Sequence, residues 1–234
     1  MTGGARRIGR EIALTLARAG ASVAITYLKS GEEARATAAQ IDALGVRSSA
    51  WKCDLRDAGQ IRSAVAQAVG QFGRLDLLIN NSGFYETRAF EELPIAEWDE
   101  AFAVNVRGPF LMTQACREQL RKQQGRVVNI GSLGGIRPWA THAHYCASKA
   151  ALHMLTQVSA KALAPDIKVN CVAPGMIDQG EAEHEELRRR FAEKTPMQRN
   201  GNANEVAQAV LFFATCPDFI TGQILTVDGG LSLS

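Results

Sequence analysis

Short apolar runs alternate along this chain with longer segments whose apolar residues recur at helical spacing. The short runs are mostly uninterrupted, which is typical of parallel strands buried on both faces, and they lie at residues 22–27, 48–55, 75–83, 126–132, 167–175 and 222–230. The segments between them predict helices at residues 6–21, 31–45, 56–73, 94–124, 144–164 and 202–215. This alternation predicts an α/β fold, a doubly wound parallel sheet with helices on both faces, in a single domain spanning residues 1–234.

A glycine-rich turn at residues 2–9 stands at the start of the chain, directly before the first predicted helix. In a dinucleotide-binding fold such a turn follows a buried strand, but no apolar run precedes it here. We therefore expect the first strand to be absent from the sequence, which either starts late or leaves an open slot in the sheet. An open slot would expose two strand edges, so a late start is favoured.

Composition excludes several functions. The net charge of +2 does not favour nucleic acid as a partner, since the basic residues are dispersed and the run Arg188–Arg190 follows a comparably acidic one. Five cysteines lack a Cys-x-x-Cys pair and the four histidines do not form a ligand set, so we expect a reducing compartment and no metal. Without an apolar run long enough for a membrane span or a signal peptide, a cytoplasmic location is expected.

The residues with the clearest catalytic potential are Ser132, Tyr145 and Lys149. Tyr145 and Lys149 are four apart in a predicted helix, so both side chains project from one face. An ammonium beside a phenol stabilises the phenolate, and together with a charged cofactor it would lower the tyrosine pKa and make Tyr145 a general acid or base. Ser132 ends a predicted buried strand, where its hydroxyl can hold a substrate oxygen. Alone, a Tyr-x-x-x-Lys pair is more often a surface helix pair.

Other motifs accompany this pair, in an order and spacing that resemble the short-chain dehydrogenase/reductase family over essentially the whole chain. They are the turn at 2–9, the segment 80–83, Asn105, Ser132, the Tyr145/Lys149 pair and the segment 170–175. The resemblance implies hydride transfer from a nicotinamide cofactor to a carbonyl carbon. It implies that Tyr145 gives the proton, Ser132 polarises the oxygen, Lys149 binds the ribose, and Asn105 anchors a relay water.

The same resemblance implies a set of cofactor-binding residues. Besides Tyr145 and Lys149 these are Gly3, Arg6, Arg7, Ile8 and Gly9 at the pyrophosphate, Asp54 and Leu55 at the adenine, Asn81, Ser82 and Gly83 near the ribose, and Pro174, Gly175 and Ile177 at the nicotinamide. A helix N-cap is the structural alternative for Asp54. Gln179 stands where the family has a threonine, which puts that contact in doubt.

Cofactor choice follows from Thr26–Ser30, at the end of the apolar run at 22–27, which lacks the carboxylate that binds the ribose diol of NAD. Arg6, Arg7, Lys29 and Ser30 suit a 2′-phosphate through charge-assisted hydrogen bonds. NADPH is therefore expected in preference to NADH. For Lys29 alone, a solvated loop position is equally plausible.

The predicted helix at 94–124 carries Asn105, a weak helix former that calls for a local reason, and an apolar face that includes Trp98 and Phe110. Together with the helix of Tyr145, it resembles the pair that forms the dimer core of family tetramers. We therefore expect a homo-oligomer, a dimer or tetramer. The charged segment 178–196 lies between two prolines and predicts a mobile helical lid over the substrate.

The resemblance implies a 3-oxoacyl thioester or a similar small ketone as substrate, since many family members of this length reduce such compounds. Arg7 and the aromatic Phe84 resemble pteridine reductases, which suggests a planar heterocycle as the alternative, with Phe84 touching substrate. Burial of Phe84 against a neighbouring loop is equally plausible. A non-catalytic cofactor-sensing or scaffold protein on the same fold is a further alternative, which the presence of both Tyr145 and Lys149 disfavours.

Overall fold

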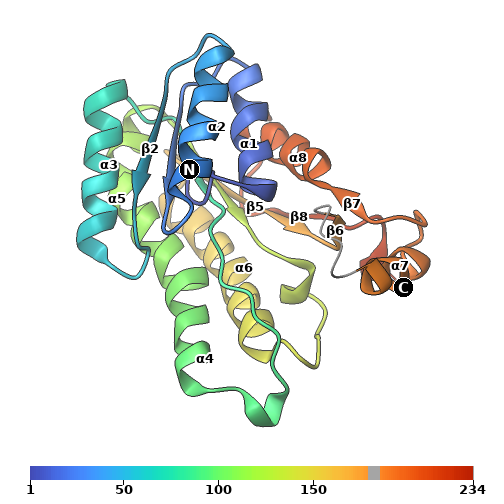
Figure 1. The fold of residues 1–234 in the computed structure, drawn as a ribbon. Helices are drawn as coiled ribbons and strands as arrows, with labels where there is room; N and C mark the ends of the chain where they lie inside the picture. Colours follow the sequence, from blue (N-terminus) through green and yellow to red (C-terminus); the bar gives the residue numbers. More distant parts are fainter. Residues whose placement is uncertain (179–184, 234) are drawn as a thin grey trace.

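The computed structural model describes residues 1–178 and 185–233, in which parallel strands form the centre and helices cover both faces (Figure 1). The predicted α/β arrangement is confirmed. The strands are β1 (Val23–Tyr27), β2 (Ser48–Lys52), β3 (Leu77–Asn80), β4 (Arg126–Ile130), β5 (Lys168–Pro174), β6 (Ile177–Asp178), β7 (Gly201–Asn202) and β8 (Ile224–Val227). The α-helices are α1 (Arg7–Arg18), α2 (Gly31–Ala43), α3 (Ala58–Phe72), α4 (Ile95–Phe102), α5 (Gly108–Lys122), α6 (Ala143–Leu163), α7 (Glu185–Lys194) and α8 (Ala203–Thr215).

In the described chain every strand pair is parallel: β6 pairs with β7 in a small separate sheet. The two central sheets consist of β1 beside β2, and of β3, β4, β5 and β8 in that order. The first three residues join the two sheets: the Thr2 amide donates to the Ile79 carbonyl and the Gly3 amide to the Thr26 carbonyl, each at 2.9 Å. The Thr26 amide in turn donates to the Met1 carbonyl at 2.9 Å. This short stretch therefore lies where the sequence indicated a missing first strand.

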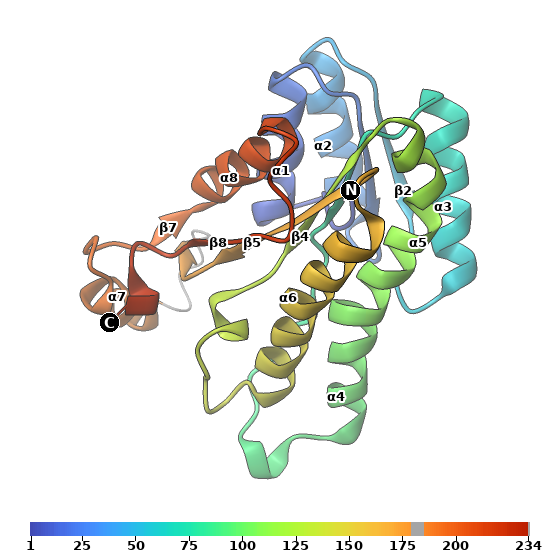
Figure 2. The same cartoon turned by 180° about the vertical axis from the view of Figure 1, so that it is seen from behind.

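The core divides between the two faces of the sheet, because neighbouring residues of a strand point in opposite directions. Leu78 and Val127 belong to the cluster that contains buried residues of α3 and α5. Ile79 and Val128, the next residues along, belong to the cluster of α1 and α8. The view from behind shows α5 and α6 side by side on their face of the sheet (Figure 2). The strands are therefore packed against helices on both faces of the sheet.

The segment predicted as one helix at 94–124 is helical throughout but changes its winding at Asn105. A π-helical turn, Ala103–Arg107, separates α4 from α5, and Asn105 lies in it fully buried. Pro109 lies in the first turn of α5. It has no backbone N–H to donate, so it fits at a point where the regular helical hydrogen bonding is interrupted. The expected local disturbance around Asn105 is confirmed.

Two helix starts show how side chains satisfy exposed backbone amides. Asp57 caps α3, since its carboxylate accepts from the amides of Gly59 and Gln60. The alternative role for Asp54 as this cap is therefore wrong, and the reason is that the helix begins later than expected. Asn202 caps α8 and forms a reciprocal capping box with Glu205.

The predicted helical segment at 178–196 contains α7, while Gln179, His184 and the rest of 179–184 lie outside the described residues. Within the described chain, no helix combines the length and apolar character that crossing a bilayer requires. Among the same residues, no three His, Cys, Asp or Glu side chains gather as a possible metal site.

Candidate active site

The structure brings Tyr145, Lys149 and Ser132 together where α6 passes the end of β4. Tyr145 and Lys149 lie one turn apart on α6, and the Lys149 amine is 5.7 Å from the centroid of the Tyr145 ring. That amine donates to the carbonyl of Ile130, the last residue of β4, at 2.8 Å. Ser132 follows two residues later and is buried. The predicted convergence of a phenol, an amine and a hydroxyl is present in the fold.

The Ser132 hydroxyl faces Tyr145 across Gly134. Its oxygen accepts a hydrogen bond from the Gly134 amide at 3.0 Å. A Cβ placed on Gly134 would lie 3.3 Å from Cε1 of Tyr145 and 3.4 Å from Oγ of Ser132. The absence of a side chain at Gly134 thus lets the two functional groups approach.

Burial moves the pKa values of the two titratable groups in opposite directions. It raises the pKa of Tyr145 to about 12, although the Ser132 hydrogen bond acts the other way. It lowers the pKa of Lys149 from 10.5 to about 8. The sequence argument expected the ammonium and a charged cofactor to lower the pKa of Tyr145. Removal of the phenol from water outweighs the effect of the cation, whose hydrogen bond goes to Ile130.

Asn105 holds the loop that follows β3. Its side-chain oxygen accepts from the Phe84 amide at 2.7 Å, and its amide nitrogen donates to the Phe84 carbonyl at 3.0 Å and to the Ser148 hydroxyl at 2.9 Å. In the π-helical turn, the side chain of Asn105 points toward α6, where Ser148 lies. Gly83 lies close to both Asn105 and Lys149: a Cβ placed on it would be 3.4 Å from Oδ1 of Asn105 and 3.7 Å from Nζ of Lys149. Asn105 therefore connects the loop to the catalytic helix.

Aromatic residues that the sequence analysis did not select surround Tyr145. Tyr85 lies edge-on to it, with ring centroids 4.9 Å apart, and Trp139 lies nearly parallel to it at 6.2 Å. His142 stacks on Tyr85 at 4.8 Å. The ring of Phe84, the predicted substrate contact, packs edge-on against His144 at 6.0 Å. In the sequence, Tyr85 directly follows Phe84, and Trp139 and His142 lie shortly before Tyr145. This proximity to predicted site residues was the signal that could have identified them.

A pocket of about 530 Å³ opens beside this aromatic group. Leu133, directly after Ser132, contributes to its wall, and Trp139 links it to Tyr145. Its lining is apolar with two cationic side chains, and consists of Leu133, Arg137, Pro138, Trp139, Phe191, Lys194 and Leu231. The pocket therefore offers room for an apolar group next to the reacting side chains.

The start of α1 fits the pyrophosphate of a dinucleotide. The N-cap residue Arg6 makes no side-chain cap and the first turn holds no acidic residue, so the helix N-terminus is suited to an anion. Gly9 packs on the turn, where a Cβ would lie 1.9 Å from the Gly3 carbonyl oxygen. The Asn81 side chain donates to the carbonyls of Thr2 and Gly3, at 3.2 and 2.9 Å. The predicted turn and the 81–83 segment are thus joined.

The cations proposed to select NADPH lie at the surface. Arg6, Arg7 and Lys29 are exposed, and Ser30 is the N-cap of α2. Arg7 has a φ of 53°, a left-handed conformation that favours glycine. The backbone of Arg7 therefore has a conformation that glycine would adopt at lower cost.

The remaining predicted cofactor residues occupy the ends of strands. Leu55 is buried, but the carboxylate of Asp54 is paired with the Arg56 guanidinium at 2.7 Å, which in turn contacts Glu100. Pro174 ends β5 and Ile177 begins β6, with the Gly175 amide donating to the Val227 carbonyl at 3.0 Å. These ends, together with Ile8 and Ser82, lie along one edge of the sheet, the usual ligand edge of such folds.

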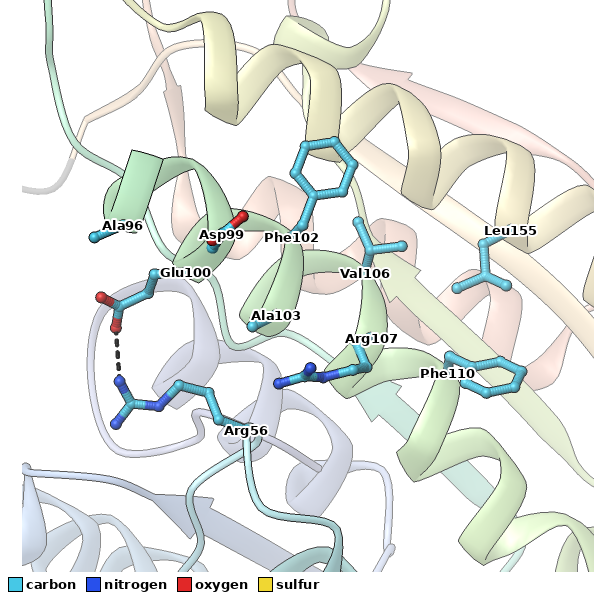
Figure 3. Close-up of a pocket in the computed structure, with 10 residues that line it drawn as sticks. All are labelled: Arg56, Ala96, Asp99, Glu100, Phe102, Ala103, Val106, Arg107, Phe110 and Leu155. Carbon is cyan, nitrogen blue, oxygen red and sulfur yellow. Dashed lines mark hydrogen bonds and ion pairs between the residues drawn. The ribbon is translucent and has the colours of Figure 1, made fainter. Parts of the chain in front are cut away.

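A second pocket, of about 770 Å³, lies on the outer side of α4, the π-helical turn and α5 (Figure 3). Phe102, Val106 and Phe110 come from this long helical segment and Leu155 comes from α6, as the close-up shows. Charged side chains of both signs also line the pocket, namely Arg56, Asp99, Glu100 and Arg107, with Arg56 and Glu100 on the side away from Phe110 and Leu155 (Figure 3).

Comparison with known proteins identifies the family. The family model described as enoyl-(acyl carrier protein) reductase matches residues 3–232. The chain is 37% identical to the 3-oxoacyl-(acyl-carrier-protein) reductase FabG of Staphylococcus aureus, over 99% of this chain and 96% of that protein.

Two solved structures extend the likeness to the fold. A short-chain dehydrogenase/reductase from Serratia marcescens shares 37% identity at a TM-score of 0.93, covering 99% of this chain and 96% of that one. A blue fluorescent protein from a metagenomic library, in complex with NADPH, shares 34% identity at a TM-score of 0.93, covering 98% and 95%. The chain therefore belongs to the short-chain dehydrogenase/reductase family of NAD(P)-dependent oxidoreductases that act on carbonyl and alcohol substrates.

Proposed function

We propose that the protein is an NADPH-dependent reductase that transfers hydride to the carbonyl carbon of a 3-oxoacyl thioester or small ketone. The observation that carries this proposal is the meeting of Ser132, Tyr145 and Lys149 at the end of β4, beside an apolar pocket. When bound, the nicotinamide supplies the hydride. The protein supplies the proton, the orientation of the carbonyl and the exclusion of water.

Tyr145 is the proton donor. A pKa raised to about 12 keeps the phenol protonated near neutral pH, which is the form that a reduction requires at its start. As negative charge develops on the substrate oxygen, the phenol proton moves to it and Ser132 holds that oxygen by a hydrogen bond. The nearby Lys149 ammonium stabilises the phenolate left behind.

Lys149 and Asn105 complete the machinery. Lys149 also binds the nicotinamide ribose, and Asn105 anchors a water that returns a proton toward Tyr145 through Lys149. Supporting this relay, Oδ1 of Asn105 and Nζ of Lys149 both approach Gly83, and a carbonyl-type oxygen can accept a second hydrogen bond beyond that from Phe84.

NADPH is the proposed cofactor because the exposed side chains of Arg6, Arg7 and Lys29 lie around the start of α1 and the end of β1. No carboxylate stands at residues 26–30 to bind the ribose diol of NADH or to repel a 2′-phosphate. The structural relative in complex with NADPH supports the same choice.

A 3-oxoacyl thioester is the leading substrate because the pocket beside Trp139 is apolar and suits an acyl chain. Arg137 and Lys194 also line it, and their positive charges suit a negatively charged carrier of the acyl group. The name of the Staphylococcus aureus relative points the same way. A planar heterocycle is the second candidate, favoured by the aromatic rings of Tyr85 and Trp139 around Tyr145. Against it, protozoal pteridine reductases place an aspartate where this chain has Ser132.

The protein is further proposed to be cytoplasmic and to act as a homo-oligomer, a dimer or tetramer. The apolar face of α4 and α5 supports the second point: Phe110 is 44% exposed beside the larger pocket, and Met154 and Val158 are exposed on α6. Arginines and carboxylates both border the pocket, so a second copy related by a two-fold axis can pair them.

A substrate panel tests the function. Acetoacetyl thioester, dihydropterin and simple sugars are each mixed with NADPH or NADH, and cofactor oxidation is followed by absorbance. The proposal expects the fastest turnover with acetoacetyl thioester and NADPH. Preference for dihydropterin would support the second candidate, and NADPH binding without turnover on any carbonyl would support a cofactor sensor.

A further inference from the structure

The main-chain amide of Ser132, just after β4, donates its hydrogen bond to a side chain and not to a neighbouring strand. The preceding amide, of Gly131, donates to the Val172 carbonyl of β5 at 2.7 Å. The Ser132 amide instead donates to Nε2 of His153, at 3.4 Å. Since Ser132 is only 4% exposed, this amide needs a partner inside the protein, and the imidazole provides it.

The His153 ring also fills the space on both sides of Ser132. A Cβ placed on Gly131 would lie 2.3 Å from Nε2 of His153, and one placed on Gly135 would lie 2.7 Å from its Cε1. The backbone before and after Ser132 therefore rests against the ring with no room for a methyl group. Displacement of the ring would free this loop to shift.

His153 continues the face of α6 that carries the catalytic pair, because Tyr145, Lys149 and His153 follow one another at intervals of four residues. All three lie against the end of β4 and the residues after it. Tyr145 and the Ser132 hydroxyl both border Gly134, the Lys149 amine donates to the Ile130 carbonyl, and His153 accepts from the Ser132 amide. We propose that His153 is a positioning residue that sets the place of the Ser132 hydroxyl beside Tyr145, an inference that rests on the proposed reductase function.

This role requires a neutral ring, because Nε2 accepts a hydrogen bond only when it is not protonated. Burial, with the positive charge of Lys149 one turn away, lowers the pKa of His153 to about 4. The other titratable group close to this contact is the thiol of Cys171, whose own pKa is raised by burial. The ring is therefore an acceptor across the neutral range.

Two variants separate positioning from packing. His153→Leu keeps an apolar body of similar size but removes the acceptor, whereas His153→Gln retains an acceptor at nearly the same reach. We expect His153→Leu to lower kcat about 100-fold with unchanged NADPH affinity, as a small displacement of a catalytic group does. We expect His153→Gln to restore most of kcat. Equal losses in the two variants, or near wild-type kcat in His153→Leu, would overturn the proposal.

Thr156→Val is the matched control. Thr156 lies on the same helix, where its hydroxyl accepts a buried hydrogen bond from Asn129 at 2.8 Å and donates to the Leu152 carbonyl at 2.9 Å. The substitution therefore removes two buried hydrogen bonds without touching Ser132. This variant is expected to lose stability and to keep kcat. A fall in kcat matching that of His153→Leu would show that general loosening of α6 explains the result, which would contradict the proposal.

Amide hydrogen exchange gives a readout that does not depend on turnover. The Ser132 amide is expected to be protected in the wild type and in His153→Gln and to exchange faster in His153→Leu. Unchanged protection in His153→Leu would overturn the positioning claim. If the wild type reduces no carbonyl, the proposed function fails, and exchange alone then decides whether His153 holds the Ser132 loop.

Discussion

The amine of Lys149 lies 5.7 Å from the centre of the Tyr145 ring, with the two residues one turn apart on α6. Burial makes the charged form of each group costly, so the pKa of the amine falls to about 8 while that of the phenol rises to about 12. The phenol of Tyr145 therefore keeps its proton near neutral pH, as its proposed role as proton donor requires.

The Lys149 shift predicts a pH-dependent stability. Between pH 8 and 10.5 the unfolded chain keeps the Lys149 proton that the folded chain has lost, so the free energy of unfolding rises with pH across this window. Relative to Lys149→Met, the wild type should gain roughly 3 kcal/mol at most over that range. Urea unfolding of both proteins at several pH values measures this. A difference that is flat or falls with pH would refute the burial argument.

Asn105→Ala should destabilise the fold by about 2–4 kcal/mol, because it leaves the amide and carbonyl of Phe84 without their partner. Chemical denaturation measures the change. Gln114→Ala, on the exposed side of α5, serves as the control and should alter stability little. If the two variants unfold alike, the π-helical turn does not depend on this amide.

Arg7→Gly should stabilise the protein by about 1 kcal/mol, because glycine suits the positive φ of 53° that arginine adopts there. It should also weaken NADPH binding more than NADH binding, since a cation near the proposed 2′-phosphate is lost. Arg10→Gly, inside α1, should instead destabilise by about 1 kcal/mol. Thermal unfolding measures the change in stability, and cofactor titration measures the change in NADPH and NADH affinity. An Arg7→Gly protein less stable than the wild type would contradict the claim that the backbone of Arg7 is strained.

Phe110→Glu should dissociate the proposed homo-oligomer, because a carboxylate would be buried among the apolar residues that border the larger pocket. Leu44→Glu is the matched control. Leu44 is the C-cap residue of α2, does not line the larger pocket, and is exposed to the same extent as Phe110, 44%. Sedimentation velocity measures the mass of each variant. A wild-type monomer, or an oligomer that survives Phe110→Glu, would exclude this face as the interface.

The sequence predicted the features that depend on local periodicity. The apolar runs located the strands of both sheets, and the four-residue spacing of Tyr145 and Lys149 placed them on one helical face. Asn105 was recognisable because a weak helix former inside a helix needs a reason, and the π-helical turn supplies it.

Features that depend on tertiary contacts were not predicted. Tyr85 and Trp139 reach Tyr145 from two different loops, so no spacing along the chain reveals their meeting. The direction of the Tyr145 pKa shift required knowledge of its burial. His153 had the right spacing on α6, but its importance appears only once the Ser132 amide is seen to leave the sheet.

The Tyr145→Phe variant tests the central claim most directly, through turnover and NADPH binding measured on the same preparation. Tyr85→Phe, which removes the other phenol near the site, provides the comparison. We predict that Tyr145→Phe binds NADPH like the wild type but turns over at least about 100-fold more slowly, whereas Tyr85→Phe loses much less. Turnover by Tyr145→Phe at about a tenth of the wild-type rate or more would contradict Tyr145 as the proton donor.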